Sequence, residues 1–164
     1  MIILNGLKDT ERALRHGAAP QKLADVKEIT GDIIRRIETG KPVVAYLAHP
    51  YKGGNMNEKT FEDHKKNNFQ HCTRIMKDIS DKWRNVAIIH PLANFDPIAD
   101  ILPVPEIMEM EKSILKKVDV LILSGNYHNS AGCMEEWTLA YYAYHIPCLR
   151  YDDDLKVLFP VFGY

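Results

Sequence analysis

The chain has little cysteine, three residues among 164, and no Cys-x-x-Cys pair. We therefore expect neither a disulfide framework nor a structural zinc site. Excess charge of one sign is also lacking, because 21 Lys and Arg residues oppose 22 Asp and Glu residues and leave a net charge of −1. A dedicated nucleic-acid binder usually carries a clear basic excess. A nucleic-acid polymer is therefore not an expected partner.

Long apolar runs are missing as well. One of the longest, Val118–Ser124, contains Asp119 and is far too short to cross a bilayer. The first residues lack a basic region followed by a long apolar stretch, so we expect no secretory signal. The composition that is present, 46% hydrophobic and 26% charged residues, is that of an ordinary globular protein. We expect a cytoplasmic protein with no membrane partner.

Short apolar runs alternate with helical patterns along most of the chain. The runs lack an apolar/polar alternation, which is typical of strands buried on both faces of a parallel sheet; they are Val43–Ala48, Val86–Ile89, Val118–Leu123 and Pro147–Tyr151. Helical spacing predicts helices between them, over 58–82, around 107–115 and over 131–144. This order predicts an α/β fold, a three-layer flavodoxin- or Rossmann-like parallel sheet of four to five strands with helices on both faces.

The two ends of the chain differ from this pattern. Residues 1–40 are predicted to form an N-terminal helical extension, because apolar residues from Leu23 to Ile37 recur at helical spacing before Gly40. The α/β domain is then predicted over 41–164. The apolar segment Phe159–Tyr164 is expected to dock on its own domain or on a neighbouring copy.

Ligands of parallel sheets bind at the carboxyl ends of the strands, which directs attention to three loops. In the first loop, Gly53 and Gly54 allow a close backbone approach, and Lys52 is a candidate partner for an anion. A turn with a solvated lysine is the alternative interpretation. The segment is not a Walker A loop, because no Gly-Lys-Ser/Thr follows at the required spacing.

The second loop, His90–Pro97, contains His90, Asn94 and Asp96. His90 either contributes to a ligand site or caps backbone groups, and Asp96 either assists catalysis or starts a turn. A metal site formed with His49 and His64 is a further alternative. The spacing resembles neither a His-x-Glu nor a His-Glu-x-x-His pattern, so we expect no metal.

The third loop leads into a helix and carries Ser130, Gly132 and Glu136. Asn129 or Ser130 is a good N-cap, and Gly132 leaves backbone N–H groups uncovered for a phosphate or a sugar hydroxyl. Helical spacing places Glu136 on a stripe of small residues that faces the sheet, together with Gly132, Ala140 and Ala143. A half-desolvated carboxylate there suits a nucleophile or general acid. The alternative is an early-helix glutamate stabilised by the helix dipole.

Three motifs together resemble one known superfamily. The segment Tyr46–Gly54 at the first strand end resembles the opening of the nucleoside 2-deoxyribosyltransferase-like superfamily. The spacing Ser130-x-Gly132-x-x-x-Glu136 resembles its second signature, and Met110–Leu123 resembles its acidic-residue helix and third strand. The matches run from about Val43 to Tyr151. The chain looks closest to a phage- or prophage-associated branch related to 2′-deoxynucleoside 5′-phosphate N-hydrolases.

The resemblance implies cleavage of an N-glycosidic bond in a nucleoside or its 5′-monophosphate. In the family, the glutamate matching Glu136 is the nucleophile that forms a covalent glycosyl-enzyme. Tyr46 matches a tyrosine near the sugar, and Glu111 falls where the family usually has an aspartate that contacts the sugar or helps to protonate the leaving base. Lys52 occupies the place of a phosphate-binding arginine, and Ser130 matches a phosphate-binding serine. No cofactor is implied.

The resulting hypothesis assigns catalysis to four residues and substrate binding to eight. The catalytic set is Glu136, Glu111, Tyr46 and Asp96; the substrate-binding set is His49, Lys52, Gly53, Gly54, His90, Asn94, Ser130 and Gly132. Two alternatives stay open: a non-catalytic nucleotide-binding module on the same fold, and a metal-dependent hydrolase that uses His49, His90 and Asp96. The resemblance and the aromatic residues of the 131–144 helix favour a homodimer or larger homo-oligomer. The alternative to an oligomer is that those aromatic residues complete the core of a single chain.

Overall fold

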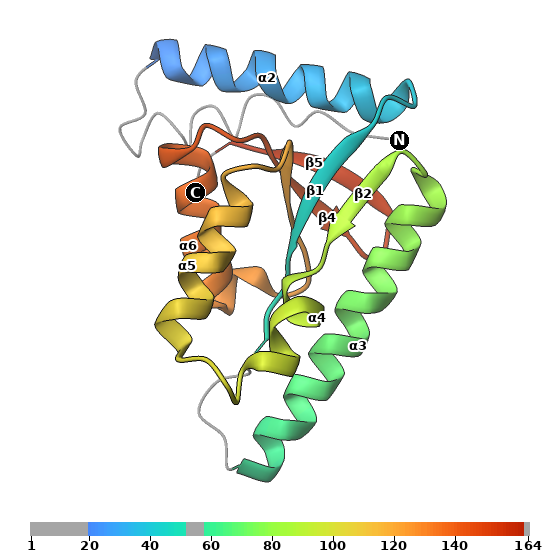
Figure 1. The fold of residues 1–164 in the computed structure, drawn as a ribbon. Helices are drawn as coiled ribbons and strands as arrows, with labels where there is room; N and C mark the ends of the chain where they lie inside the picture. The colour runs from blue at the N-terminus through green and yellow to red at the C-terminus, as the bar shows by residue number, and fades with distance from the viewer. Residues whose placement is uncertain (1–19, 52–57, 163–164) are drawn as a thin grey trace.

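The centre of the molecule is a five-stranded sheet with the strand order β2-β1-β3-β4-β5 (Figure 1). The computed structural model describes residues 20–51 and 58–162. The strands are β1 (Val43–Ala48), β2 (Val86–Ile89), β3 (Val120–Leu123), β4 (Cys148–Asp152) and β5 (Val157–Val161). The four runs expected as strands are thus strands, which confirms the predicted α/β class.

Strand pairing is parallel through most of the sheet. β1 pairs in parallel with β2 and β3, and β3 pairs in parallel with β4. β5 pairs antiparallel with β4, so the sheet is mixed at one edge. A short turn suffices for this antiparallel pair, whereas a parallel strand would need a long crossover. Pro160 suits this edge strand, because proline cannot donate to a ladder.

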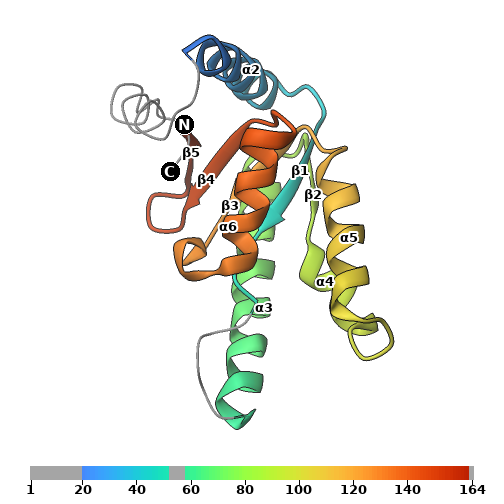
Figure 2. The same ribbon diagram turned by 90° about the vertical axis from the view of Figure 1, so that its left-hand side faces the viewer.

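Helices cover both faces of the sheet (Figures 1 and 2). α3 packs on one face, and α5 and α6 pack on the other. The helical elements are α2 (Pro20–Glu38), α3 (Glu58–Lys82), α4 (Pro91–Phe95), η1 (Asp96–Ile98), α5 (Val104–Leu115), η2 (Tyr127–Asn129), α6 (Ala131–Thr138) and η3 (Leu139–Ala143). None of the described helices is both long and apolar enough to span a membrane.

The core has one apolar cluster on each face of the sheet. Successive side chains of a strand point to opposite faces, and β1 follows this rule: Ala45 and Leu47 pack toward α3, and Tyr46 and Ala48 pack toward α6. Both clusters are apolar because both faces are covered by helices. This burial explains why β1 shows no apolar/polar alternation.

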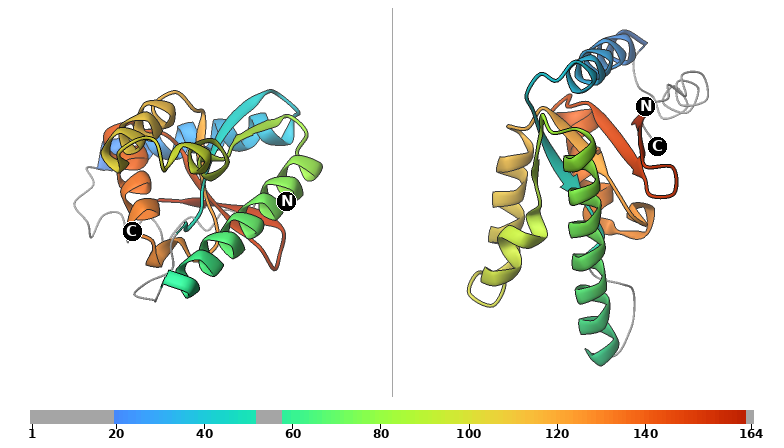
Figure 3. Two further views of the ribbon diagram at one scale, coloured as in Figure 1. Left: turned by 60° about the horizontal axis from the view of Figure 1, so that its bottom comes forward. Right: turned by 90° about the vertical axis from the view of Figure 1, so that its right-hand side faces the viewer.

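α2, the helix predicted within the N-terminal extension, packs against the sheet. Ile33, Ile34 and Ile37 are buried in the same cluster as β1 and α3, and Val26 belongs to the other cluster. Figures 1 and 3 show α2 crossing the end of the sheet at which the parallel strands begin. This helix therefore lies opposite the strand ends at which a ligand site is expected.

The segment expected as one helix over 131–144 changes its winding within its length. α6 is α-helical to Thr138, and η3 continues as a π-helical turn in which the Tyr144 N–H donates to the Leu139 carbonyl over 2.8 Å. The wider turn shifts the face that later residues present. Ala140 is buried as expected, but Ala143 is exposed. The prediction that Ala143 extends the sheet-facing stripe is therefore wrong.

The aromatic residues of this segment pack within one chain. Trp137 and Tyr141 are buried in the cluster between α6 and the sheet, and Tyr142 and Tyr144 are partly buried against it. They therefore complete a core without a second subunit. The oligomeric state stays a prediction.

Candidate active site

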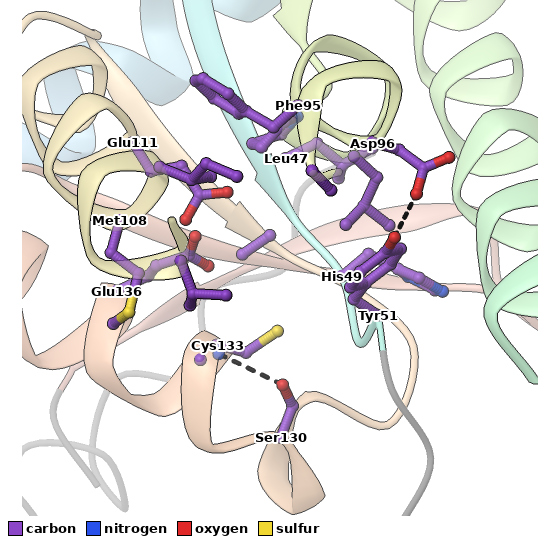
Figure 4. A pocket seen from close by; sticks show the side chains of 17 residues that line it. Leu47, His49, Tyr51, Phe95, Asp96, Met108, Glu111, Ser130, Cys133 and Glu136 are labelled. Carbon is purple, nitrogen blue, oxygen red and sulfur yellow. Dashed lines mark hydrogen bonds between the residues drawn. The ribbon is translucent and has the colours of Figure 1, made fainter. Parts of the chain in front are cut away.

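A cavity of about 220 Å³ opens at the carboxyl ends of the parallel strands, between β1, α4, α5 and the start of α6 (Figure 4). One part of its wall is polar and includes Glu111, Ser130 and Glu136. The remaining wall is largely apolar, with Leu47, Ala48, Pro91, Leu92, Phe95, Ala99, Val104, Ile107, Met108 and Cys133 among its residues. The cavity thus combines a largely apolar surface with the carboxyl groups of Asp96, Glu111 and Glu136.

The start of α6 positions Glu136. Ser130 is the N-cap residue, and its hydroxyl oxygen accepts a hydrogen bond from the Cys133 N–H over 3.3 Å, which confirms the predicted cap. One turn later, Glu136 reaches the cavity on the same helix face as Gly132 and Cys133. There the Tyr46 hydroxyl donates a hydrogen bond of 2.5 Å to Glu136 Oε1.

Burial controls the charge of this pair. Desolvation raises the pKa of Glu136 from 4.5 to about 8, the hydrogen bond from Tyr46 opposes that rise, and the negative charges of Glu111 and Glu135 add to it. Desolvation, followed by the charge of Glu136, raises the pKa of the Tyr46 phenol far above its ordinary value. Tyr46 therefore stays protonated and acts as a hydrogen-bond donor.

Glu111 reaches the same cavity from α5. Its carboxyl group lies opposite that of Glu136 in Figure 4. Burial, and then the charge of Glu135, raises the pKa of Glu111. The site therefore contains two neighbouring carboxyl groups whose pKa values are both raised, and such a pair does not easily carry two negative charges.

His49 lies at the end of β1 and is held on several sides. Its Nδ1 lies 2.9 Å from the Ser124 hydroxyl, which itself donates to the Ala48 carbonyl over 2.9 Å. The Ser124 oxygen must then accept the hydrogen of His49 Nδ1, which fixes the tautomer. Desolvation and the neighbouring His71 and His90 lower the pKa of His49 to about 3. His49 is therefore a neutral part of the wall rather than a cation for an anionic ligand.

Gly125 is required beside that histidine. Its φ is +61°, and a Cβ atom at this position would lie 2.5 Å from His49 Cε1. Both the backbone conformation and the space exclude a larger residue. Ser124 and Gly125 are thus positioning residues that the sequence analysis did not single out.

Asp96 lines the cavity but does not join the two glutamates. Its carboxylate accepts a hydrogen bond from the Tyr51 hydroxyl and lies 3.6 Å from Lys65 Nζ. Figure 4 shows this carboxylate directed toward Tyr51 and away from Glu111 and Glu136. In this arrangement Asp96 connects Tyr51 and Lys65 at the rim of the cavity, and its carboxylate is occupied by these two partners.

His90 and Asn94 are not among the described residues that line the cavity. His90 is buried and caps α4, since its Nδ1 accepts from the Ala93 N–H over 3.3 Å. This is the capping role that was considered as an alternative. Asn94 is exposed. Within 20–51 and 58–162, no group of three or more His, Cys, Asp or Glu side chains is arranged to hold a metal ion.

Three residues predicted to bind substrate in the loop after β1, Lys52, Gly53 and Gly54, lie outside the described residues. Gly132 does line the cavity, and a Cβ atom there would meet only the Ser130 hydroxyl, at 3.9 Å. No packing inside the described chain therefore requires a glycine at this position.

The apolar wall is the part of the site that the sequence analysis missed. Val104, Ile107, Met108 and Glu111 lie at the i, i+3, i+4, i+7 spacing that defines one helix face. This spacing can be read from the sequence, but it indicates only a buried helix face. It does not distinguish a face that lines a cavity from a face that packs in the core. Tyr51 and Phe95 had no such signal, because loop and short-helix geometry places them.

Comparison with known proteins gives no identification. No protein-family model, no curated protein sequence and no solved structure matches the chain. Functional assignment therefore depends on the chemistry of the cavity.

Proposed function

We propose that this chain cleaves or transfers at the N-glycosidic bond of a nucleoside or deoxynucleoside, or of its 5′-monophosphate. The observation that carries the proposal is the 2.5 Å hydrogen bond from Tyr46 to Glu136 in a cavity that a second carboxyl group, Glu111, also enters. Glycoside cleavage commonly uses two carboxyl groups, one as nucleophile and one as acid and base. The resemblance of three sequence motifs to the nucleoside 2-deoxyribosyltransferase-like superfamily supports the same chemistry.

In the first step, an oxygen of ionised Glu136 attacks C1′ of the sugar. The bond from C1′ to the base nitrogen breaks, and its electron pair stays on the base. Protonated Glu111 donates its proton to the base, so the products are a covalent glycosyl ester on Glu136 and a neutral base. The positive charge that develops at C1′ favours the ionised form of Glu136, and the Tyr46 hydrogen bond stabilises the same form.

In the second step, Glu111, now a carboxylate, accepts a proton from water or from a second base. The activated acceptor attacks C1′, and Glu136 leaves as a carboxylate. Water as acceptor gives hydrolysis, and a base gives transfer. The raised pKa of Glu111 suits it to both roles, because burial makes this carboxyl group hold a proton more tightly than an ordinary glutamate while it can still give the proton up and recover it.

The cavity wall divides into parts that suit the two halves of a nucleoside. Phe95, Ile107 and Met108 offer an apolar surface to the base. Ser130 and Gly132 lie at the start of α6, where backbone N–H groups favour a hydroxyl or a phosphate. A monophosphate and an unphosphorylated nucleoside are both included in the proposal.

The test is release of free base from a panel of deoxynucleosides, ribonucleosides and their 5′-monophosphates, followed by liquid chromatography. Including a second base in parallel reactions separates transfer from hydrolysis. We expect at least one substrate to be cleaved, and Glu136→Ala to lose at least about 10³-fold in rate, because it removes the nucleophile. Intact-mass measurement of acid-quenched reactions should show a glycosyl adduct that Glu136→Ala lacks.

Glu109→Gln is the matched control, because it removes an exposed carboxylate from the same helix as Glu111 and leaves the cavity lining unchanged. It should keep the unmodified rate. No base release from any compound, or equal rates for Glu136→Ala and the unmodified chain, would refute the proposal. Saturable nucleotide binding without turnover would instead indicate the non-catalytic binding module.

A further inference from the structure

An ion pair on the outer side of the site connects the two helices that carry the glutamates. Lys112 Nζ on α5 lies 3.2 Å from Glu135 Oε1 on α6. Each partner is the immediate chain neighbour of a cavity carboxyl group, since Lys112 follows Glu111 and Glu135 precedes Glu136. The ion pair therefore connects α5 and α6 directly beside the two residues whose carboxyl groups enter the cavity.

We propose that Lys112 and Glu135 are positioning residues whose ion pair places a paired negative charge beside the two carboxyl groups and thereby sets the charge which that carboxyl pair experiences. The inference rests on the proposed function in treating Glu111 and Glu136 as the reacting groups. Neither Lys112 nor Glu135 lines the cavity, so both act through their neighbours.

The electrostatic part of the argument comes from the position of Glu135. Its charge contributes to the raised proton affinity of both Glu111 and Glu136. Lys112 pairs with Glu135 and thereby offsets part of this charge. Removing Glu135 should therefore ease ionisation of the carboxyl pair, and removing Lys112 should hinder it.

Other charged and titratable groups near the pair do not produce this two-way effect. From β1, Tyr46 contacts Glu136 and stays protonated, and His49 stays neutral. From α6, burial raises the pKa of Cys133 to about 12, so it stays a thiol. Tyr51 and Asp96 lie at the rim and bond to each other. Glu109 also contacts Lys112, over 3.5 Å, but is mostly exposed.

The stability of the fold should depend little on this ion pair. The side chains of Lys112 and Glu135 are 29% and 44% exposed. Surface pairs of this kind contribute little to folding. Variants at both positions should therefore fold, which allows their effect on the carboxyl groups to be measured directly.

The test is a carbon-13 NMR titration of the full chain labelled at glutamate carboxyl carbons, with Glu111→Gln and Glu136→Gln used to assign the two signals. We expect Glu135→Gln to lower the apparent pKa values of the carboxyl pair and Lys112→Gln to raise them, each by roughly half a pH unit at low salt. Both differences should shrink in about 0.5 M salt, and Glu106→Gln, which removes an exposed carboxylate from the first turn of α5, should leave the titration unchanged.

Shifts of opposite sign for Glu135→Gln and Lys112→Gln support the proposal, and the pH–rate profile should move in the same directions. Shifts of the same sign, or no shift in either variant, would overturn the proposal. An ion pair that acted only by holding the two helices together would give the same pKa change whichever partner is removed. The titration does not need turnover. Opposite shifts in a chain that releases no base would therefore leave this inference standing and refute the proposed function.

Discussion

Replacing Glu136 by glutamine should stabilise the protein at alkaline pH. Glu136→Gln keeps the size of the side chain and an oxygen that can accept the Tyr46 hydrogen bond, but it removes the buried ionisable group. The folded chain binds the Glu136 proton more tightly than the unfolded chain does, because burial raises the pKa from 4.5 to about 8. Stability contributed by this protonated group is complete below about pH 4.5 and is lost as the pH rises through 8.

The size of this loss in stability follows from the difference between the two pKa values of Glu136, 4.5 in the unfolded chain and about 8 in the folded chain. At about 1.4 kcal/mol per pH unit, the full loss is at most roughly 5 kcal/mol. Water reaching the cavity lowers the expected value to about 2–4 kcal/mol. Between pH 5 and pH 9, the free energy of unfolding of the unmodified chain should therefore fall by this amount relative to Glu136→Gln.

Urea denaturation of both chains at pH 5, 6, 7, 8 and 9 measures this difference. Using the difference between the two chains cancels titrations that they share, and Glu109→Gln serves as the exposed-carboxylate control. The expected outcome is a gap that widens with pH in favour of Glu136→Gln. Parallel stability curves would show that Glu136 ionises at its ordinary pKa, and the reasoning about its burial would be refuted.

Three further predictions concern the surroundings of that carboxyl group. Tyr46→Phe removes the 2.5 Å hydrogen bond, so the pKa of Glu136 should rise further and base release should fall about 10- to 100-fold, measured across pH. In Gly132→Ala the added methyl group would meet only the Ser130 hydroxyl, at 3.9 Å, so the urea midpoint should not fall, while nucleotide affinity measured by calorimetry should fall if the ligand approaches that backbone. Gly125→Ala should lower the free energy of unfolding by about 1–3 kcal/mol in the same urea assay, because φ is +61° and the methyl group would collide with His49. Equal base release by Tyr46→Phe, unchanged affinity for every ligand of Gly132→Ala, or full stability of Gly125→Ala would contradict the respective argument.

Much of the fold could be predicted because a strand that is buried on both faces is a short run of apolar residues without apolar/polar alternation. β1, for example, was predicted at the residues that the structure gives. α3 also has the expected bounds, since its apolar residues keep helical spacing over its whole length. β5 was expected only as a docked apolar segment, because its direction depends on the pairing with β4 rather than on its own residues. The π-helical turn η3 left no local signal that separates it from an α-helix.

The candidate site was predictable where one helix or strand positions the residue. Ser130, Gly132 and Glu136 follow from helical spacing and a capping residue, whereas Tyr46 was expected only because its motif resembles that of a known superfamily. Asp96 shows the limit, because its partner Tyr51 lies in another loop, and sequence spacing carries no information about that contact. The apolar wall was missed for the same reason.

The strand order also has a consequence for how the chain reaches its folded state. β1 lies between β2 and β3, and the Val44 N–H bonds to the Asp119 carboxylate, 75 residues further along the chain. The long loop between these residues must close before β1 can pair with β3, and such a closure slows folding. The β4–β5 hairpin, joined by a tight turn, needs no such closure and can form first. Pulse-labelling hydrogen exchange should therefore find amides of β4 and β5 protected before those of β1, so that the cavity is among the last features to be assembled.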